Sequence, residues 1–137
     1  MQEKPKPMLG FSADSFQTLI DSAKSKKRII MIECTADWCL PCKQMEKYTF
    51  TDSVLIKYAK KNLICKKWDA SSFDDFDLLT KYKVEKFPTI LFLSFEGKEI
   101  SRLMGFQTAK NIMDASEKIY HPRKIFPAKK FTPLPKK

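Results

Sequence analysis

Apolar and polar residues alternate along the chain with two different periods, which separate predicted helices from predicted strands. Residues 16–23 carry apolar side chains at helical spacing, which predicts a helix that buries one face and is capped by Ser12. Residues 28–35 are almost wholly apolar, as expected for a central strand that is covered on both sides. The start of the chain, residues 8–11, predicts a short edge strand.

The same two periods continue through the rest of the chain. Pro41 suits the first turn of a helix that reaches about Tyr48. In the later helices, the helical spacing places Val54, Phe76 and Leu79 on the buried faces. These later elements are strands at 63–68, 89–95 and 99–104, and helices at 54–59, 74–82 and 108–120.

The predicted order, β-α-β-α-β-α-β-β-α, indicates an α/β fold with a central mixed sheet flanked by helices. The early β-α-β unit implies parallel pairing, and the turn at Glu96 and Gly97 adds an antiparallel hairpin. A chain of 137 residues is long enough for one domain with its own core. We place this domain at 8–120, between a flexible N-terminal segment (1–7) and a basic, proline-rich tail (121–137).

Cys39 and Cys42 stand two residues apart, directly after a predicted strand and at the start of a predicted helix. The partial positive charge at a helix N-terminus stabilises a thiolate, so Cys39 is the expected nucleophile. Cys42 lies one turn further into the helix and can attack a mixed disulfide on Cys39, which makes it the expected resolving thiol. The pattern predicts a dithiol redox centre, because a structural disulfide across so short a loop would stabilise the chain little.

The other two cysteines, Cys34 and Cys65, each fall in a predicted buried strand and are expected to be inert core thiols. The spacing Cys34-x4-Cys39-x2-Cys42, with Cys65 later, also fits an iron–sulfur or zinc site. Ligands of such sites usually lie on loops, so the apolar strands around Cys34 and Cys65 favour the dithiol over the metal site. A binding module without redox chemistry is a third alternative.

The charge and the apolar runs limit the other classes of function. The net charge is +10, and residues 123–137, with Phe126 and Phe131, come nearest to a basic stripe with interleaved aromatic residues. That footprint is weak, so a solvated basic surface is expected and a nucleic acid is not the expected partner. The longest apolar runs are far too short to span a bilayer, and residues 1–10 lack the apolar core of a signal peptide. The composition fits a cytoplasmic protein or a mature domain.

With the dithiol, the sequence Phe87-Pro88-Thr89 at the start of a late strand gives the chain a resemblance to thioredoxin over about residues 8–120. The string Ala-Asp-Trp-Cys-x-x-Cys-Lys-x-x-Glu-Lys-Tyr-Thr-Phe, which begins at Ala36, resembles the C-terminal thioredoxin-like domain of the disulfide-interchange family DsbD more narrowly. The dipeptide between the cysteines, Leu40-Pro41, is more similar to the Gly-Pro of thioredoxin than to the dipeptides of many oxidising relatives. This similarity favours a reductant.

The resemblance implies a substrate-binding surface beside the dithiol. Pro88 matches the family's cis-proline, whereas an ordinary trans proline would be the default without the resemblance. A cis bond turns the preceding backbone outward, so Phe87 is expected to pair main chain to main chain with an extended substrate. Trp38 is expected to line the same surface, with a core position as its alternative.

Two carboxylates also match the family. Glu33 matches a buried acid that is an aspartate in thioredoxin, and burial would raise its pKa and suit it to carry the proton of Cys42. A strand-end carboxylate that faces water is the alternative. Glu46, four residues after Cys42, matches a further acid of the DsbD domain, and a solvated helix residue is its alternative.

The resemblance thus implies a thiol:disulfide oxidoreductase that reduces protein disulfides. It is expected to be a monomer and to use neither cofactor nor metal. Its electrons would come from a thiol protein, which is membrane-embedded in the DsbD family. That family acts on periplasmic substrates, so the periplasm is the expected compartment, with the cytoplasm as the alternative.

Overall fold

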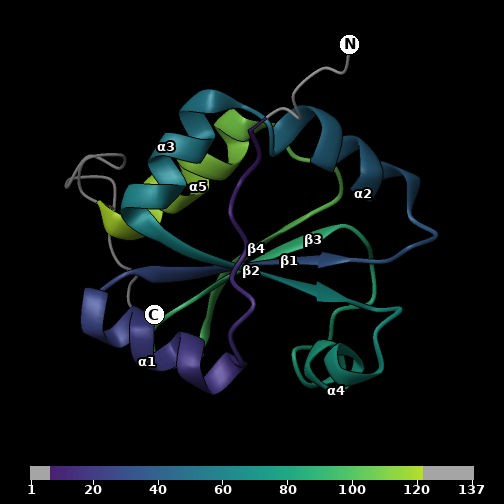
Figure 1. The fold of residues 1–137 in the computed structure, drawn as a ribbon, viewed down its shortest axis with the longest axis horizontal. Coiled ribbons are helices and arrows are strands. Elements are labelled where there is room, and N and C mark those ends of the chain that lie inside the picture. The colour runs from purple at the N-terminus through teal and green to yellow at the C-terminus, as the bar shows by residue number, and fades with distance from the viewer. Residues whose placement is uncertain (1–6, 122–137) are drawn as a thin grey trace, which may run out of the picture.

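The computed structural model describes residues 7–121, which form a four-stranded sheet between two layers of helices (Figure 1). In chain order the elements are α1 (Phe16–Lys26), β1 (Ile29–Thr35), α2 (Leu40–Gln44), the π-helical turn η1 (Met45–Thr49), α3 (Ser53–Asn62), β2 (Leu63–Asp69), α4 (Phe73–Lys81), β3 (Thr89–Leu93), β4 (Glu99–Met104) and α5 (Ala109–Tyr120). Within this part of the chain, no helix is both long enough and apolar enough to cross a membrane.

The sheet is mixed, as predicted, and its strands lie in the order β2-β1-β3-β4. The pair β1–β2 is parallel and is joined through α2, η1 and α3, while β3 runs antiparallel to both β1 and β4. Every residue of β1 is buried, which confirms the central strand that its almost wholly apolar sequence predicts. The dithiol follows the C-terminal end of this strand.

Successive residues of β1 point to opposite sides of the sheet and belong to two separate cores. Met31 packs in a core with residues of η1, α3 and α5, whereas Ile30 and Ile32 pack in a second core with residues of α1 and α4. Figure 1 shows the same division, with α3 and α5 above the sheet and α1 and α4 below it.

The predicted edge strand at residues 8–11 is wrong, because this segment crosses the edge of the sheet instead of extending it. The backbone N–H of Leu9 donates to the carbonyl of Phe50 (2.8 Å), and that of Ser12 donates to the carbonyl of Cys65 in β2 (2.8 Å). Leu9 is only 4% exposed. The apolar residues of this segment therefore reflect packing of Leu9 into the core rather than a strand ladder.

Three local predictions about helices are also corrected. Helix α1 is capped by the side chain of Ser15, which accepts a hydrogen bond from the backbone N–H of Thr18, and not by Ser12. Val54 and Phe76 are 61% and 57% exposed, so neither belongs to the core. Leu55 and Leu79 are buried, as their helical spacing predicts.

Candidate redox-active site

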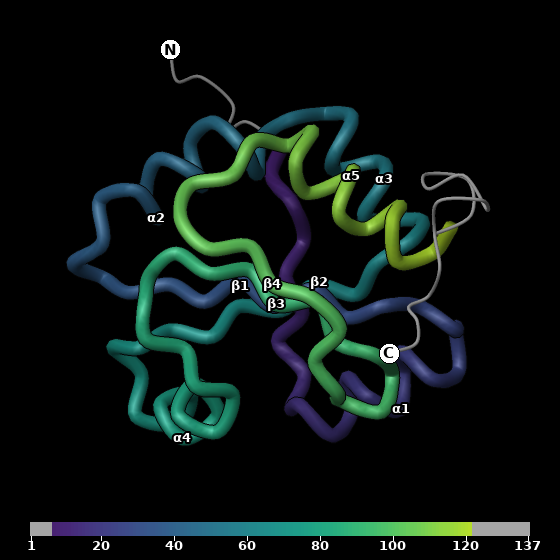
Figure 2. The backbone as a smooth tube through the Cα atoms, turned by 180° about the vertical axis from the view of Figure 1, so that it is seen from behind, coloured from purple at the N-terminus to yellow at the C-terminus, as the bar shows by residue number. Residues whose placement is uncertain are grey.

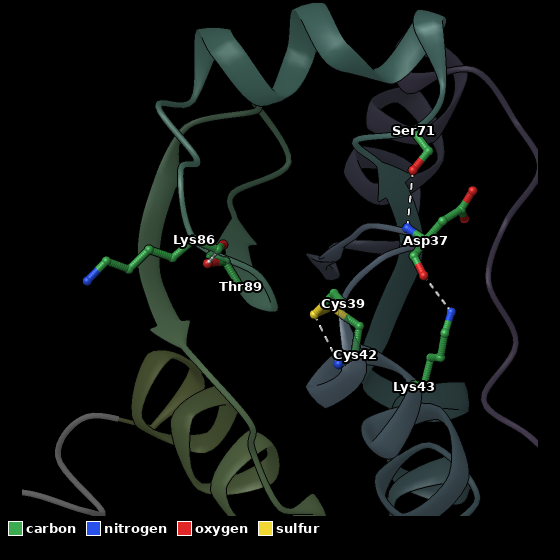
Figure 3. Close-up of a disulfide and its surroundings, with 7 residues drawn as sticks. All are labelled: Asp37, Cys39, Cys42, Lys43, Ser71, Lys86 and Thr89. Atoms are coloured by element: carbon green, nitrogen blue, oxygen red, sulfur yellow. Dashed lines mark hydrogen bonds between the residues drawn. A yellow bond between two sulfur atoms is a disulfide. The ribbon is translucent and has the colours of Figure 1, made fainter.

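Cys39 and Cys42 lie at the corner between β1 and α2, where they form a disulfide with a Cα–Cα distance of 5.3 Å (Figure 3). Cys39 is the N-cap of α2, and its Sγ accepts a hydrogen bond from the backbone N–H of Cys42 (3.2 Å). Pro41 occupies the first turn of the helix, where its missing N–H has no intrahelical partner to lose. The N–H groups at this end of α2 therefore point at the sulfur on which a thiolate would form.

The two cysteines are less exposed to solvent than a reactive thiol is expected to be. Cys39 is 4% exposed and Cys42 is 1% exposed, because both pack with Ala36 against Ala70 and Phe87. Cys39 is nonetheless the more accessible of the two. This order of access is the one that a nucleophile and a buried resolving thiol need.

An aromatic rim borders the disulfide. Trp38 is 72% exposed, so it lies on the surface and not in the core. Its ring stands edge-to-face against Phe87, with a centroid distance of 5.7 Å and an interplanar angle of 83°. Two hydrogen bonds of the Asp37 backbone hold the loop that carries Trp38 (Figure 3). The N–H of Asp37 donates to Ser71 Oγ (3.1 Å), and its carbonyl accepts from Lys43 Nζ (2.6 Å).

The peptide bond between Phe87 and Pro88 is cis. The Pro88 carbonyl accepts a hydrogen bond from the N–H of Gly105 (2.8 Å), and the Thr89 hydroxyl donates to the Lys86 carbonyl (2.7 Å), so both sides of the bend are fixed. Among the hydrogen bonds between residues 7 and 121, none uses the backbone N–H or C=O of Phe87. Those two groups are thus available to an extended polypeptide that lies beside the disulfide.

Glu33 is fully buried, so the alternative of a carboxylate that faces water is wrong. Neither carboxyl oxygen has a hydrogen-bond partner among the described residues. Burial raises the pKa of Glu33 from 4.5 to about 7; nearby Lys67 opposes that rise, and Glu46 and Asp69 add to it. A carboxyl with such a pKa can both accept and release a proton near neutral pH.

Lys67 lies between the two predicted carboxylates, although no motif in the sequence singles it out. Its Nζ lies 3.2 Å from Glu46 Oε2, and its backbone pairs with Glu33 across the parallel strands β1 and β2. Both side chains of the Lys67–Glu46 ion pair are about one third exposed. The available signal was a pair of lysines, Lys66 and Lys67, inside a predicted buried strand. The pairing of Lys67 with Glu33 depends on the strand register, which the sequence does not display.

The remaining cysteines do not share the site. Cys34 and Cys65 are buried free thiols in different cores, on opposite faces of the sheet, and burial raises the pKa of each. The four cysteines therefore do not converge on one ion, and the described residues contain no other group of three or more potential ligands. His121 follows the end of α5 and is exposed.

Comparison with known proteins agrees with this geometry. The chain is 37% identical over 127 residues to the thiol:disulfide interchange protein DsbD of Tatumella citrea, which covers 90% of this chain but only 20% of that protein. It thus spans about a fifth of the length of this relative. Its DsbD relative in Actinobacillus pleuropneumoniae is 35% identical over 106 residues, which is 75% of this chain and 18% of that protein.

Solved structures share the fold. The oxidised C-terminal domain of DsbD from Neisseria meningitidis superimposes with a TM-score of 0.63 at 20% identity, covering 82% of this chain and 98% of that one. The family model for thioredoxin matches residues 8–118, which include the disulfide, the cis-proline and Glu33. By that match this chain belongs to the thioredoxin family.

Proposed function

We propose that this protein is a thiol:disulfide oxidoreductase that reduces disulfides in other proteins through a mixed disulfide on Cys39. The observation that carries the proposal is the Cys39–Cys42 pair at a helix N-terminus, beside a cis-proline whose preceding residue has unused backbone groups. A helix N-terminus favours the thiolate, and the unused groups offer a substrate a place to pair. Relatives of this chain that are named thiol:disulfide interchange proteins support the same class of reaction.

In the reduced protein, the Cys39 thiolate attacks one sulfur of a substrate disulfide, and the other substrate sulfur leaves as a thiolate. Cys42 then loses its proton and attacks Cys39 Sγ, which forms the disulfide seen here and releases the second substrate thiolate. Two electrons pass from the protein dithiol to the substrate, and the two thiol protons end on the substrate thiols.

Cys42 is the group that needs help with its proton, because it is the more deeply buried thiol. Glu33 lies in the strand that leads into the dithiol loop, and its pKa of about 7 suits it to accept that proton when Cys42 attacks. Lys67 and Glu46 are positioned beside it and set how readily it ionises.

The proposed direction is reduction of substrates, so the cycle requires a thiol protein that returns two electrons to the Cys39–Cys42 disulfide. A membrane-embedded donor and a periplasmic location follow from the DsbD relatives and belong to this proposal. The substrate is a disulfide-bearing protein with an extended segment that can lie against Phe87, and the protein acts as a monomer without cofactor or metal.

Single substitutions of the two cysteines test the proposal. Cys39→Ser is expected to abolish reduction of insulin disulfides, because the attacking thiolate is gone. Cys42→Ser is expected to accumulate a mixed disulfide with a disulfide peptide, detected as a mass increase that maps to Cys39. Cys34→Ala is the matched control and should keep wild-type activity, since Cys34 lies in another core. An adduct on Cys34 or Cys65, or activity in Cys39→Ser, would contradict the assignment.

A further inference from the structure

The positive charge of the molecule is concentrated at the end remote from the disulfide. Helices α1, α3 and α5 all end at the N-terminal edge of β1 and β2. Two hydrogen bonds connect the helix ends to the start of β1. The N–H of Ile29 donates to the Tyr120 hydroxyl of α5 (2.8 Å), and Arg28 Nη1 donates to the Lys60 carbonyl of α3 (3.0 Å). Figure 1 shows these three helix ends together on the left, while α2 and α4 lie on the right.

We call this end the basic pole and define it by residues 24–28, 57–62 and 117–121. It contains eight lysines and arginines and one acidic residue, Glu117, which accepts a hydrogen bond from the Tyr58 hydroxyl (2.6 Å). The basic residues are Lys24, Lys26, Lys27, Arg28, Lys57, Lys60, Lys61 and Lys118. All are exposed except Arg28, which is half-buried.

The opposite end has no such excess. The dithiol loop and the α4 region, residues 36–43 and 69–88, carry four lysines against six acidic residues. The turn between β3 and β4 lies on the same side as the basic pole, because β3 is antiparallel to β1, but its Glu96 and Lys98 cancel. The molecule is therefore strongly polarised along β1, with the dithiol at its less basic end.

Helix geometry explains only part of this pattern. The partial negative charge at a helix C-terminus favours a nearby cation, which accounts for a lysine in the last turn of each helix. It does not account for a surface, formed by the ends of three helices, that contains eight cations and only one anion. Lysine is a strongly hydrated point charge on a flexible stem, which suits diffuse attraction to a charged plane.

We propose that the basic pole is a docking surface for an anionic phospholipid bilayer. None of the large hydrophobic side chains that are exposed in the described residues belongs to the pole, so it lacks the apolar centre of a protein interface and the aromatic platforms that stack on bases. A membrane that holds the protein by this end leaves Cys39 and Trp38 directed away from the lipid, toward the disulfide-bearing substrate. A membrane-embedded electron donor would then reach the disulfide only after this electrostatic contact is released.

Flotation with lipid vesicles tests the proposal on the full chain. The wild type is expected to bind vesicles of phosphatidylglycerol and phosphatidylcholine in equal parts, to bind pure phosphatidylcholine vesicles far less, and to dissociate as salt is raised. Each lysine near an anionic surface contributes about fivefold in affinity. The triple variant Lys24→Gln, Lys60→Gln, Lys61→Gln should therefore bind roughly a hundredfold more weakly.

The matched control is Lys47→Gln, Lys81→Gln, Lys110→Gln, which removes the same charge outside the basic pole. It is expected to keep most of the vesicle affinity, and both variants should keep insulin reduction, which shows that they are folded. Three results would overturn the proposal: equal binding of the wild type to both kinds of vesicle, an equal loss in the two triple variants, or tighter binding to double-stranded DNA than to the anionic vesicles at the same phosphate concentration.

Discussion

The buried carboxyl of Glu33 links the stability of the fold to pH. Its pKa in the folded protein is about 7, against 4.5 for the free side chain, so the folded state holds the proton more tightly than the unfolded state. The stability that this proton provides is complete below about pH 4.5 and is lost as pH rises through 7. Across that window the loss is roughly 3 kcal/mol.

Glu33→Gln should therefore stabilise the protein at neutral and alkaline pH. Glutamine cannot ionise, so the variant escapes the cost of a buried carboxylate that has no hydrogen-bond partner among the described residues. Denaturant melts at pH 8 should show a gain of roughly 2–3 kcal/mol over the wild type, and melts at pH 5 should show little difference. A gain of equal size at both values of pH would mean that ionisation of Glu33 is not the cause.

The same substitution should slow the second step of the reaction more than the first. Cys39 is activated by the helix terminus, whereas Cys42 is buried and needs a base. Stopped-flow fluorescence of Trp38 can separate attack on the substrate from release of the product. Glu46→Gln is the comparison variant and should change the second step less, because Glu46 is over one third exposed, pairs with Lys67 and acts on Glu33 only through its charge. If Glu33→Gln changes neither rate, the proton leaves Cys42 by another route.

At the scale of elements, the segment 7–12 stabilises the fold although it forms no strand. Leu9 is buried in the core that covers the α3 and α5 face, and Phe11 stands edge-to-face on Phe50 with a centroid distance of 5.4 Å. Lys67 Nζ lies 5.1 Å from the centre of the Phe11 ring, so this segment also covers the lysine beside Glu33. Its loss would therefore disturb both the core and the surroundings of the carboxyl.

Leu9→Ala should lower the free energy of unfolding by about 2–4 kcal/mol, as expected for a leucine removed from a core. Met8→Ala is the matched control; Met8 is 42% exposed, and the change should stay within about 0.5 kcal/mol. Urea melts of both variants measure the two values. Equal, small effects would show that the segment contributes little to the core.

The elements that were predictable from sequence are those whose pattern is local. An almost wholly apolar run was enough for β1, and Cys39, Pro41 and Cys42 marked the strand-to-helix corner. The errors arose where packing depends on distant partners. The spacing of Phe76 fits a buried helix face, yet α4 contacts the sheet through Leu79, and the role of Lys67 depends on its pairing with Glu33 in the parallel register.

At the scale of the whole molecule, the two cores, the sheet and the site are all formed by residues 9–120. The basic tail is therefore not needed to build any of them. The predicted tail, 121–137, lies outside the described residues apart from His121. In Figure 2, which shows the fold from behind, α5 closes the layer over the sheet, so the elements that bury the core are complete by Tyr120. The domain should then fold without the residues that follow.

Deleting residues 123–137 should leave the melting temperature and the rate of insulin reduction unchanged. The deleted segment contains three prolines and six lysines and arginines, and its few apolar residues have no helical or strand period with which to join a core. Cation-exchange elution at lower salt confirms the loss of charge in the truncated protein. Calorimetry of both proteins measures the melting temperature. A decrease of several degrees on truncation would show that Phe126 or Phe131 packs against the domain, and the boundary of the folded unit would then move beyond residue 120.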